Sequence, residues 1–220
     1  MAQVEYKYII IISAQTSWVY NIQEIVSFSA IALDAKTKLV LASYSRELAP
    51  HFVKPLSNDN MSFSFVYDGF RELFADYLSE ALYVTVGNKL LHKIIPGQLL
   101  MDEKIFSKGT CRGQLMDNNG ACRLGGGGEL EVPIIKEWCN IARLFQICTG
   151  ISVRTLSHNQ QSRKMVEFYD IPWRFRIGLD WCYSIAAVIR KLCDGSNENF
   201  NLRPTCRAAS GDGSVLEFLA

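Results

Sequence analysis

The chain has 220 residues, of which 49% are hydrophobic and 20% are charged, a composition typical of one globular domain with a sizeable core. Its formal net charge of +1 argues against a dedicated non-specific nucleic-acid binder, so a role of that kind would need a local basic patch. No apolar run approaches the roughly 20 residues that a membrane span needs, and the N-terminus has no secretory pattern. We therefore expect an intracellular protein, cytoplasmic or nuclear, with no membrane partner.

The metal-binding residue types form no cluster in the sequence. The seven cysteines have irregular spacings that match neither a C-x-x-C pair nor a zinc motif, which predicts free thiols in a reducing compartment: Cys111, Cys122, Cys139, Cys148, Cys182, Cys193 and Cys206. His51, His92 and His158 are scattered and suggest neither a catalytic triad nor a metal site. The sequence thus predicts no cofactor and no metal.

The N-terminal quarter predicts a buried strand followed by a hairpin. The apolar run Tyr8–Ile12 breaks into small polar residues at Ser13–Gln15, as a strand does when its end delivers side chains to a site. Residues Ile22–Leu33 and Leu39–Tyr44 then alternate in polarity around the polar segment Asp34–Lys38, which indicates two paired strands with a turn between them.

The middle of the chain is less regular. Apolar residues at helical spacing predict an amphipathic helix over Asp68–Leu82, whereas Leu99–Phe106 fits either a helix or a strand. The four glycines Gly125–Gly128 lack the Lys-Ser/Thr and the preceding strand of a phosphate-binding loop, so we interpret them as part of a flexible surface insertion.

The last third predicts helices with clear ends. Periodicity alone makes Val132–Gly150 one helix that stops at its final glycine. Ser157 and Gln160 form a capping box for a helix through Tyr169, and a last helix runs from near Asp180 to Asp194. We expect a single domain over residues 1–197 and a loosely ordered tail over residues 198–220.

The phrase Arg176–Gly195 keeps a G-L-D, I-A and D-G frame: Gly178-Leu179-Asp180, Ile185-Ala186 and Asp194-Gly195. It resembles the signature H-S-G-L-D-D-C-x-N-I-A-x-I-x-x-x-L-x-x-D-G of DEDDh 3′-5′ exonucleases of the ERI-type, histone-mRNA branch. The resemblance implies an α/β RNase H-like exonuclease fold, in which a mixed five-stranded sheet with three antiparallel first strands is flanked by helices. It also implies a short strand near Cys139–Ala142 in place of helix.

The same resemblance locates the family's catalytic positions, and each of them is altered here. Ser13 and Gln15 replace the D-x-E of the first strand, Gln114 is the best match to a third aspartate, Arg176 replaces the histidine and Trp181 the last aspartate. The family uses carboxylates to hold two divalent metals and the histidine as general base. Neutral oxygens, an indole and a guanidinium supply neither function, so we expect no nuclease activity and no catalytic residue.

Two functions of different classes follow from this loss. In the first, the chain is a pseudo-nuclease that acts as a protein-interaction or scaffold subunit of an RNA-processing, RNA-silencing or other ribonucleoprotein assembly. In the second, it binds single-stranded RNA without cleavage in the former groove, with Arg174, Arg176 and Trp181 as candidate contacts. Trp181 either fills the emptied metal pocket or stacks on a base, and the two arginines either hold a phosphate or form surface ion pairs. A rebuilt enzyme lacks a nucleophile–base pair in the sequence, and the oligomeric state stays open.

Overall fold

The computed structural model describes residues 6–19, 22–48, 62–108, 135, 137–172, 178–194, 202–207 and 217–218. The strands are β1 (Tyr8–Val19), β2 (Ile22–Asp34), β3 (Val40–Glu47), β4 (Ala81–Thr85), β5 (Glu137–Asn140), β6 (Cys206–Arg207) and β7 (Glu217–Phe218). The helices are α1 (Phe63–Leu73), α2 (Ala75–Leu78), α3 (Ile95–Lys108), α4 (Ile141–Thr149), α5 (His158–Phe168) and α6 (Leu179–Asp194), and a π-helical turn η1 (Leu90–Ile94) precedes α3. No helix in these ranges is long and apolar enough to cross a membrane.

The strands form one mixed sheet in the order β3-β2-β1-β4-β5-β6-β7. Strands β1, β2 and β3 pair antiparallel, and β4 and β5 run parallel to β1, which confirms the predicted α/β class and the antiparallel start. The predicted five strands are extended by two strands of two residues each: β6 pairs with β5, and β7 pairs with β6. Residues 206–207 and 217–218 of the expected C-terminal tail therefore belong to the sheet.

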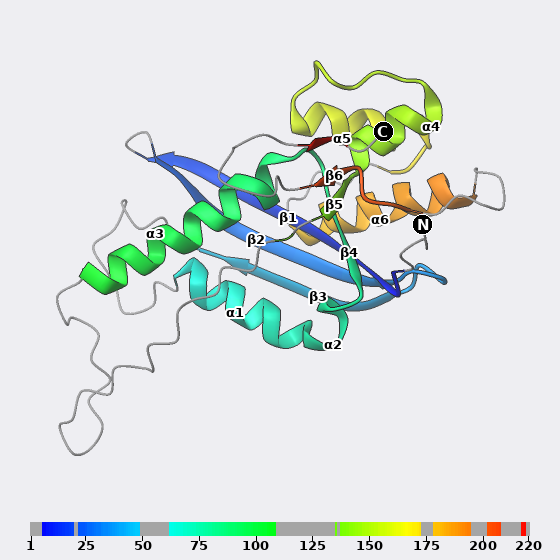
Figure 1. The fold of residues 1–220 in the computed structure, drawn as a ribbon. Helices are drawn as coiled ribbons and strands as arrows, with labels where there is room; N and C mark the ends of the chain where they lie inside the picture. Colours follow the sequence, from blue (N-terminus) through cyan, green and yellow to red (C-terminus); the bar gives the residue numbers. More distant parts are fainter. Residues whose placement is uncertain are drawn as a thin grey trace.

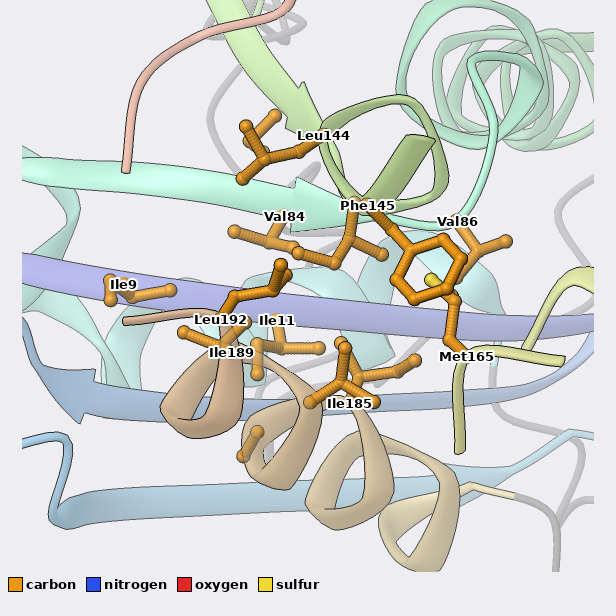
Figure 2. Packing of buried hydrophobic residues seen from close by; sticks show 14 of the residues in the cluster. Ile9, Ile11, Val84, Val86, Leu144, Phe145, Met165, Ile185, Ile189 and Leu192 are labelled. Atoms are coloured by element: carbon orange, nitrogen blue, oxygen red, sulfur yellow. The ribbon is translucent and has the colours of Figure 1, made fainter. Parts of the chain in front are cut away.

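Helices cover both faces of the sheet (Figure 1). Alternation along β1 divides its isoleucines between two cores, because successive side chains of a strand point to opposite faces. Ile10 and Ile12 pack with residues of α1 and α3, whereas Ile9 and Ile11 pack with residues of α4, α5 and α6. Figure 2 shows the second cluster, in which Ile185 and Ile189 of α6 face the strands. The result is a helix–sheet–helix sandwich with a hydrophobic core on each side.

The predicted helix over Asp68–Leu82 is wrong at both ends. The helix begins earlier, at Phe63, because the hydroxyl of Ser62 accepts a hydrogen bond from the backbone N–H of Phe65. It is interrupted at Phe74, and the chain then enters β4, where Ala81–Val84 pair with β1. The backbone pairing of a buried parallel strand overrides the local helical periodicity here.

The other predicted elements are observed with small changes of length. Strand β1 continues past Gln15 to Val19 because β2 pairs with it throughout. The ambiguous segment Leu99–Phe106 is helical. Strand β5 ends at Asn140 and α4 follows at once, so the short strand implied by the resemblance is confirmed and the single helix over Val132–Gly150 is wrong.

Two predicted helix ends are confirmed in detail. Gly150 ends α4 in the left-handed conformation, with φ 74°. The capping box of α5 is complete, since the Ser157 hydroxyl accepts from the Gln160 amide and the Gln160 side chain accepts from the Ser157 amide. The Gly125–Gly128 segment lies outside the described residues.

Candidate functional site: a cleft beside β1

A cleft of about 740 Å³ opens beside β1 where β4 leaves the sheet. Strand β4 pairs with β1 over Tyr8–Ile11, and the chain then turns into the loop before η1. The cleft is lined from β1 and β2, from the β4–η1 connection, from the start of α5 and from α6: Ile12, Ser13, Ala14, Gln15, Thr16, Gln23, Val86, Lys89, Leu90, Ile94, His158, Asn159, Gln160, Arg163 and Trp181. Its volume is in the range of small-ligand sites, about 300–1,000 Å³.

Three of the residues singled out in the sequence meet in this cleft. Ser13 and Gln15 lie two apart on β1 and so face the same side of the sheet, and Trp181 enters from the first turn of α6. The register of β1 and β2 shifts between Gln15 and Thr16, and such irregularities commonly re-aim side chains next to a site. Gln114, Arg174 and Arg176 lie outside the described residues, so their predicted roles stay predictions.

The indole of Trp181 is anchored. Its Nε1 donates a hydrogen bond to the hydroxyl of Ser162 at 3.1 Å, and that hydroxyl donates to the carbonyl of His158 at 3.0 Å. Trp181 is half-buried and packs against the core cluster of α4, α5 and α6. The ring is therefore a fixed wall of the cleft, with its polar edge turned toward α5.

The loop that carries Lys89 is fixed by a network centred on Asn140. The side-chain oxygen of Asn140 accepts from the amide of Gly87 at 3.0 Å and from the amide of Ala142 at 3.2 Å, and its amide nitrogen donates to Asn88 at 2.9 Å. The thiol of Cys206 also donates to the Asn88 side chain. These bonds hold the Gly87–Lys89 loop, and with it Lys89, against β5 and the C-terminal segment.

Gly87 and His158 are in close contact at the rim. Gly87 has φ +80°, and a Cβ built on it would lie 2.2 Å from Nε2 of His158. His158 as a whole is exposed, but this contact covers one edge of its ring. Burial of the ring, together with the charge of Lys89, lowers the pKa of His158.

The ionisable side chains of the cleft are all basic or neutral. Lys89 and Arg163 are exposed cations and His158 is a third basic group, whereas no Asp or Glu occurs among the described lining residues. Arg163 also donates through Nε to Glu167 at 2.7 Å, an exposed pair one turn along α5. The sequence reasoning missed Lys89, His158 and Arg163, because their convergence depends on where β4 and α5 end in space.

These side chains do not suit a pair of divalent cations. Such ions need several oxygen ligands and negative charge, whereas the cleft offers the hydroxyl of Ser13, the amide of Gln15 and the indole of Trp181. Elsewhere in the described ranges, no group of three or more His, Cys, Asp or Glu side chains is placed to hold a metal ion. The five described cysteines, at 139, 148, 182, 193 and 206, are free thiols.

Comparisons with known proteins support the fold. No protein-family model and no curated protein matches this sequence. A solved structure described as 3′-end specific recognition of histone mRNA stem-loop by 3′-exonuclease is similar with a TM-score of 0.67 and 18% identity, and the match covers 99% of this chain and 92% of that one. The nuclease domain of 3′hExo, a DEDDh family member bound to rAMP, gives a TM-score of 0.63 at 18% identity, with 94% and 100% covered.

A third similar structure is cell-death related nuclease 4, with a TM-score of 0.61 and 16% identity over 86% of this chain and 64% of that one. At these identities the likeness establishes the fold: the chain is an α/β protein with the RNase H-like architecture of DEDDh exonucleases.

Proposed function

We propose that the chain is a catalytically inactive member of the DEDDh exonuclease family, of the ERI-type branch, and that it works in an RNA-processing assembly by binding rather than cleavage. The observation that carries this proposal is the composition of the cleft, where Ser13, Gln15 and Trp181 meet and no carboxylate occurs among the described lining residues. Without anionic ligands the cleft cannot neutralise the two metal ions that activate water in this chemistry.

The ligand that the geometry favours is single-stranded RNA. The cleft has room for nucleotide-sized groups, two exposed cations in Lys89 and Arg163, and several uncharged hydrogen-bonding side chains, among them Gln23 and Asn159. Cations that track a phosphate backbone, with polar groups around them, are the usual basis of single-strand binding. Binding without hydrolysis would make the chain a non-cleaving reader of RNA ends or single strands.

A protein partner is the second candidate, and a separate surface favours it. Phe65 on α1 is 64% exposed, and Leu100 on the adjacent helix α3 is 45% exposed. Exposed aromatic and aliphatic side chains on neighbouring helices are common in protein interfaces. In this case the domain would serve as a scaffold subunit.

One experiment separates the two candidates. The tagged protein is captured from its native source, the sample is divided, and one half is treated with RNase before mass spectrometry. Co-purified proteins that vanish with RNase, together with RNA crosslinked to cleft peptides, are expected for the RNA reader. If stoichiometric protein partners remain after RNase treatment and no RNA is crosslinked, the scaffold function is supported and the RNA-binding function is not.

A further inference from the structure

We propose that Lys89 and Arg163 form a phosphate-binding site that works without a divalent metal ion, and that its ligand is a nucleotide or the phosphate backbone of a single RNA strand. This inference rests on the proposed function, because it assigns the contacts of a ligand that the cleft binds and does not cleave. It replaces the metal ions of a nuclease site by two side-chain cations.

The two cations are supplied from different elements of the same cleft. Lys89 immediately precedes η1, and Arg163 lies in the second turn of α5. Both side chains are exposed, so that neither has to be taken out of a core to reach a ligand. The bond from Arg163 to Glu167 uses Nε, and the guanidinium retains further N–H donors for a phosphate oxygen.

Lys89 is held by a preorganised backbone. Asn140 binds the amide of Gly87 and the side chain of Asn88, and the buried Cys206 donates to Asn88 as well. A cation on a fixed loop loses less conformational freedom when it binds an anion than one on a loose segment. The loop therefore holds the Lys89 backbone in place without a ligand.

The surroundings favour an anion over a cation. The described lining residues add hydroxyl and amide groups, such as those of Thr16 and Gln160, and contribute no negative charge. A divalent cation would be repelled by Lys89 and Arg163, whereas a phosphate group would be attracted by both. Phosphate binding should thus persist in EDTA, and added Mg²⁺ should weaken it by screening and by competing for the phosphate.

The test compares two double variants that remove the same charge. Lys89→Ala/Arg163→Ala changes the cleft, and Lys93→Ala/Lys164→Ala removes two exposed cations that lie near them in sequence and outside the cleft. Binding of adenosine 5′-monophosphate is measured by NMR titration, and binding of a fluorescent single-stranded oligoadenylate by anisotropy, each in EDTA and in Mg²⁺. A thermal melt confirms that each variant is folded.

We expect the wild type and the Lys93/Lys164 variant to bind both probes in EDTA. The Lys89/Arg163 variant should bind the RNA at least about tenfold more weakly, since two charge-assisted contacts are lost. For this variant, a plot of log affinity against log salt concentration should have a slope that is less steep by about 0.7 for each phosphate contact removed. If the Lys89/Arg163 variant also loses binding of adenosine 5′-monophosphate, the site binds free nucleotides. If it loses only RNA binding, the ligand of the site is the RNA strand.

The inference is overturned if both double variants weaken binding equally, or if the wild type needs Mg²⁺ to bind. If the Lys89/Arg163 variant binds RNA with full affinity, the proposed phosphate site is wrong, but the proposed RNA-binding function still holds. Failure of the wild type to bind either probe, or cleavage of the RNA, would remove the RNA reader itself.

Discussion

The indole N–H of Trp181 donates to the hydroxyl of Ser162 across 3.1 Å and so joins α6 to α5 at the edge of the cleft. Ser162 is itself buried and bonded to the first residue of α5. The indole therefore connects two helices and forms part of the structure of the cleft.

Replacing Trp181 by phenylalanine should destabilise the fold by about 1–2 kcal/mol, because the hydrogen bond to Ser162 is lost and the ring becomes smaller. The urea-unfolding midpoint measures this change. Tyr183→Phe is the matched control, since Tyr183 is on the same helix but 40% exposed, and its midpoint should stay close to that of the wild type. Equal midpoints for Trp181→Phe and the wild type would show that the bond contributes no stability.

Gly87→Ala should destabilise the protein by about 2 kcal/mol or more. The residue adopts φ +80°, and its new Cβ would overlap the His158 ring. Gly97 in α3 provides the control, because a Cβ there meets nothing within 4 Å and alanine favours the helix by about 1 kcal/mol. The melting temperature should fall for Gly87→Ala and not for Gly97→Ala. A melting temperature of Gly87→Ala equal to that of the wild type would contradict the Gly87–His158 contact.

Acid should destabilise the fold in part through His158. Its folded pKa lies below the ordinary imidazole value, so the unfolded chain binds a proton that the folded chain resists. This contribution is present above the ordinary pKa of about 6.5 and is lost as the pH falls through the lowered folded value. Between about pH 7.5 and about pH 5, the unfolding midpoint of His158→Gln should fall less than that of the wild type. An equal fall in both proteins would exclude the contact as the cause.

Carboxylates introduced on β1 should give the cleft a weak affinity for metal. Ser13→Asp/Gln15→Glu places two acids on one face of the strand, inside the cleft. We expect Mn²⁺ to raise the melting temperature of this variant by about 2–4 °C and to leave the wild type unchanged. Leu41→Glu/Ser43→Asp on the edge strand β3 is the control with the same added charge, and an equal Mn²⁺ effect there would mean that the cleft plays no special part.

Local signals made several elements predictable. Three predicted features depend only on neighbours in sequence, and the structure shows all of them: the hairpin around Asp34, the capping box of Ser157 and the helix end at Gly150. The start of β4 after α2 was missed because Ala81–Val84 adopt strand geometry through pairing with β1, a contact that local periodicity does not contain. Long-range pairing also places β6 beside β5.

The residues of the candidate site show the same difference between local and long-range information. Ser13, Gln15 and Trp181 were found because a family signature fixes their positions in sequence. Lys89 and Arg163 were missed because they match no motif and line the same cleft only through the packing of the β4–η1 connection and α5. Neither polarity alternation nor residue spacing in a single sequence shows which distant residues the fold brings to one cleft.

The proposed property of the cleft is RNA binding without cleavage. The direct measurement incubates purified protein with 5′-labelled single-stranded RNA and Mg²⁺ or Mn²⁺, and follows RNA length and bound fraction in the same samples. The RNA should be bound and should stay at full length in both metals. Metal-dependent shortening from the 3′ end, reduced by substitution of Gln15 or Trp181, would contradict it and show a working nuclease.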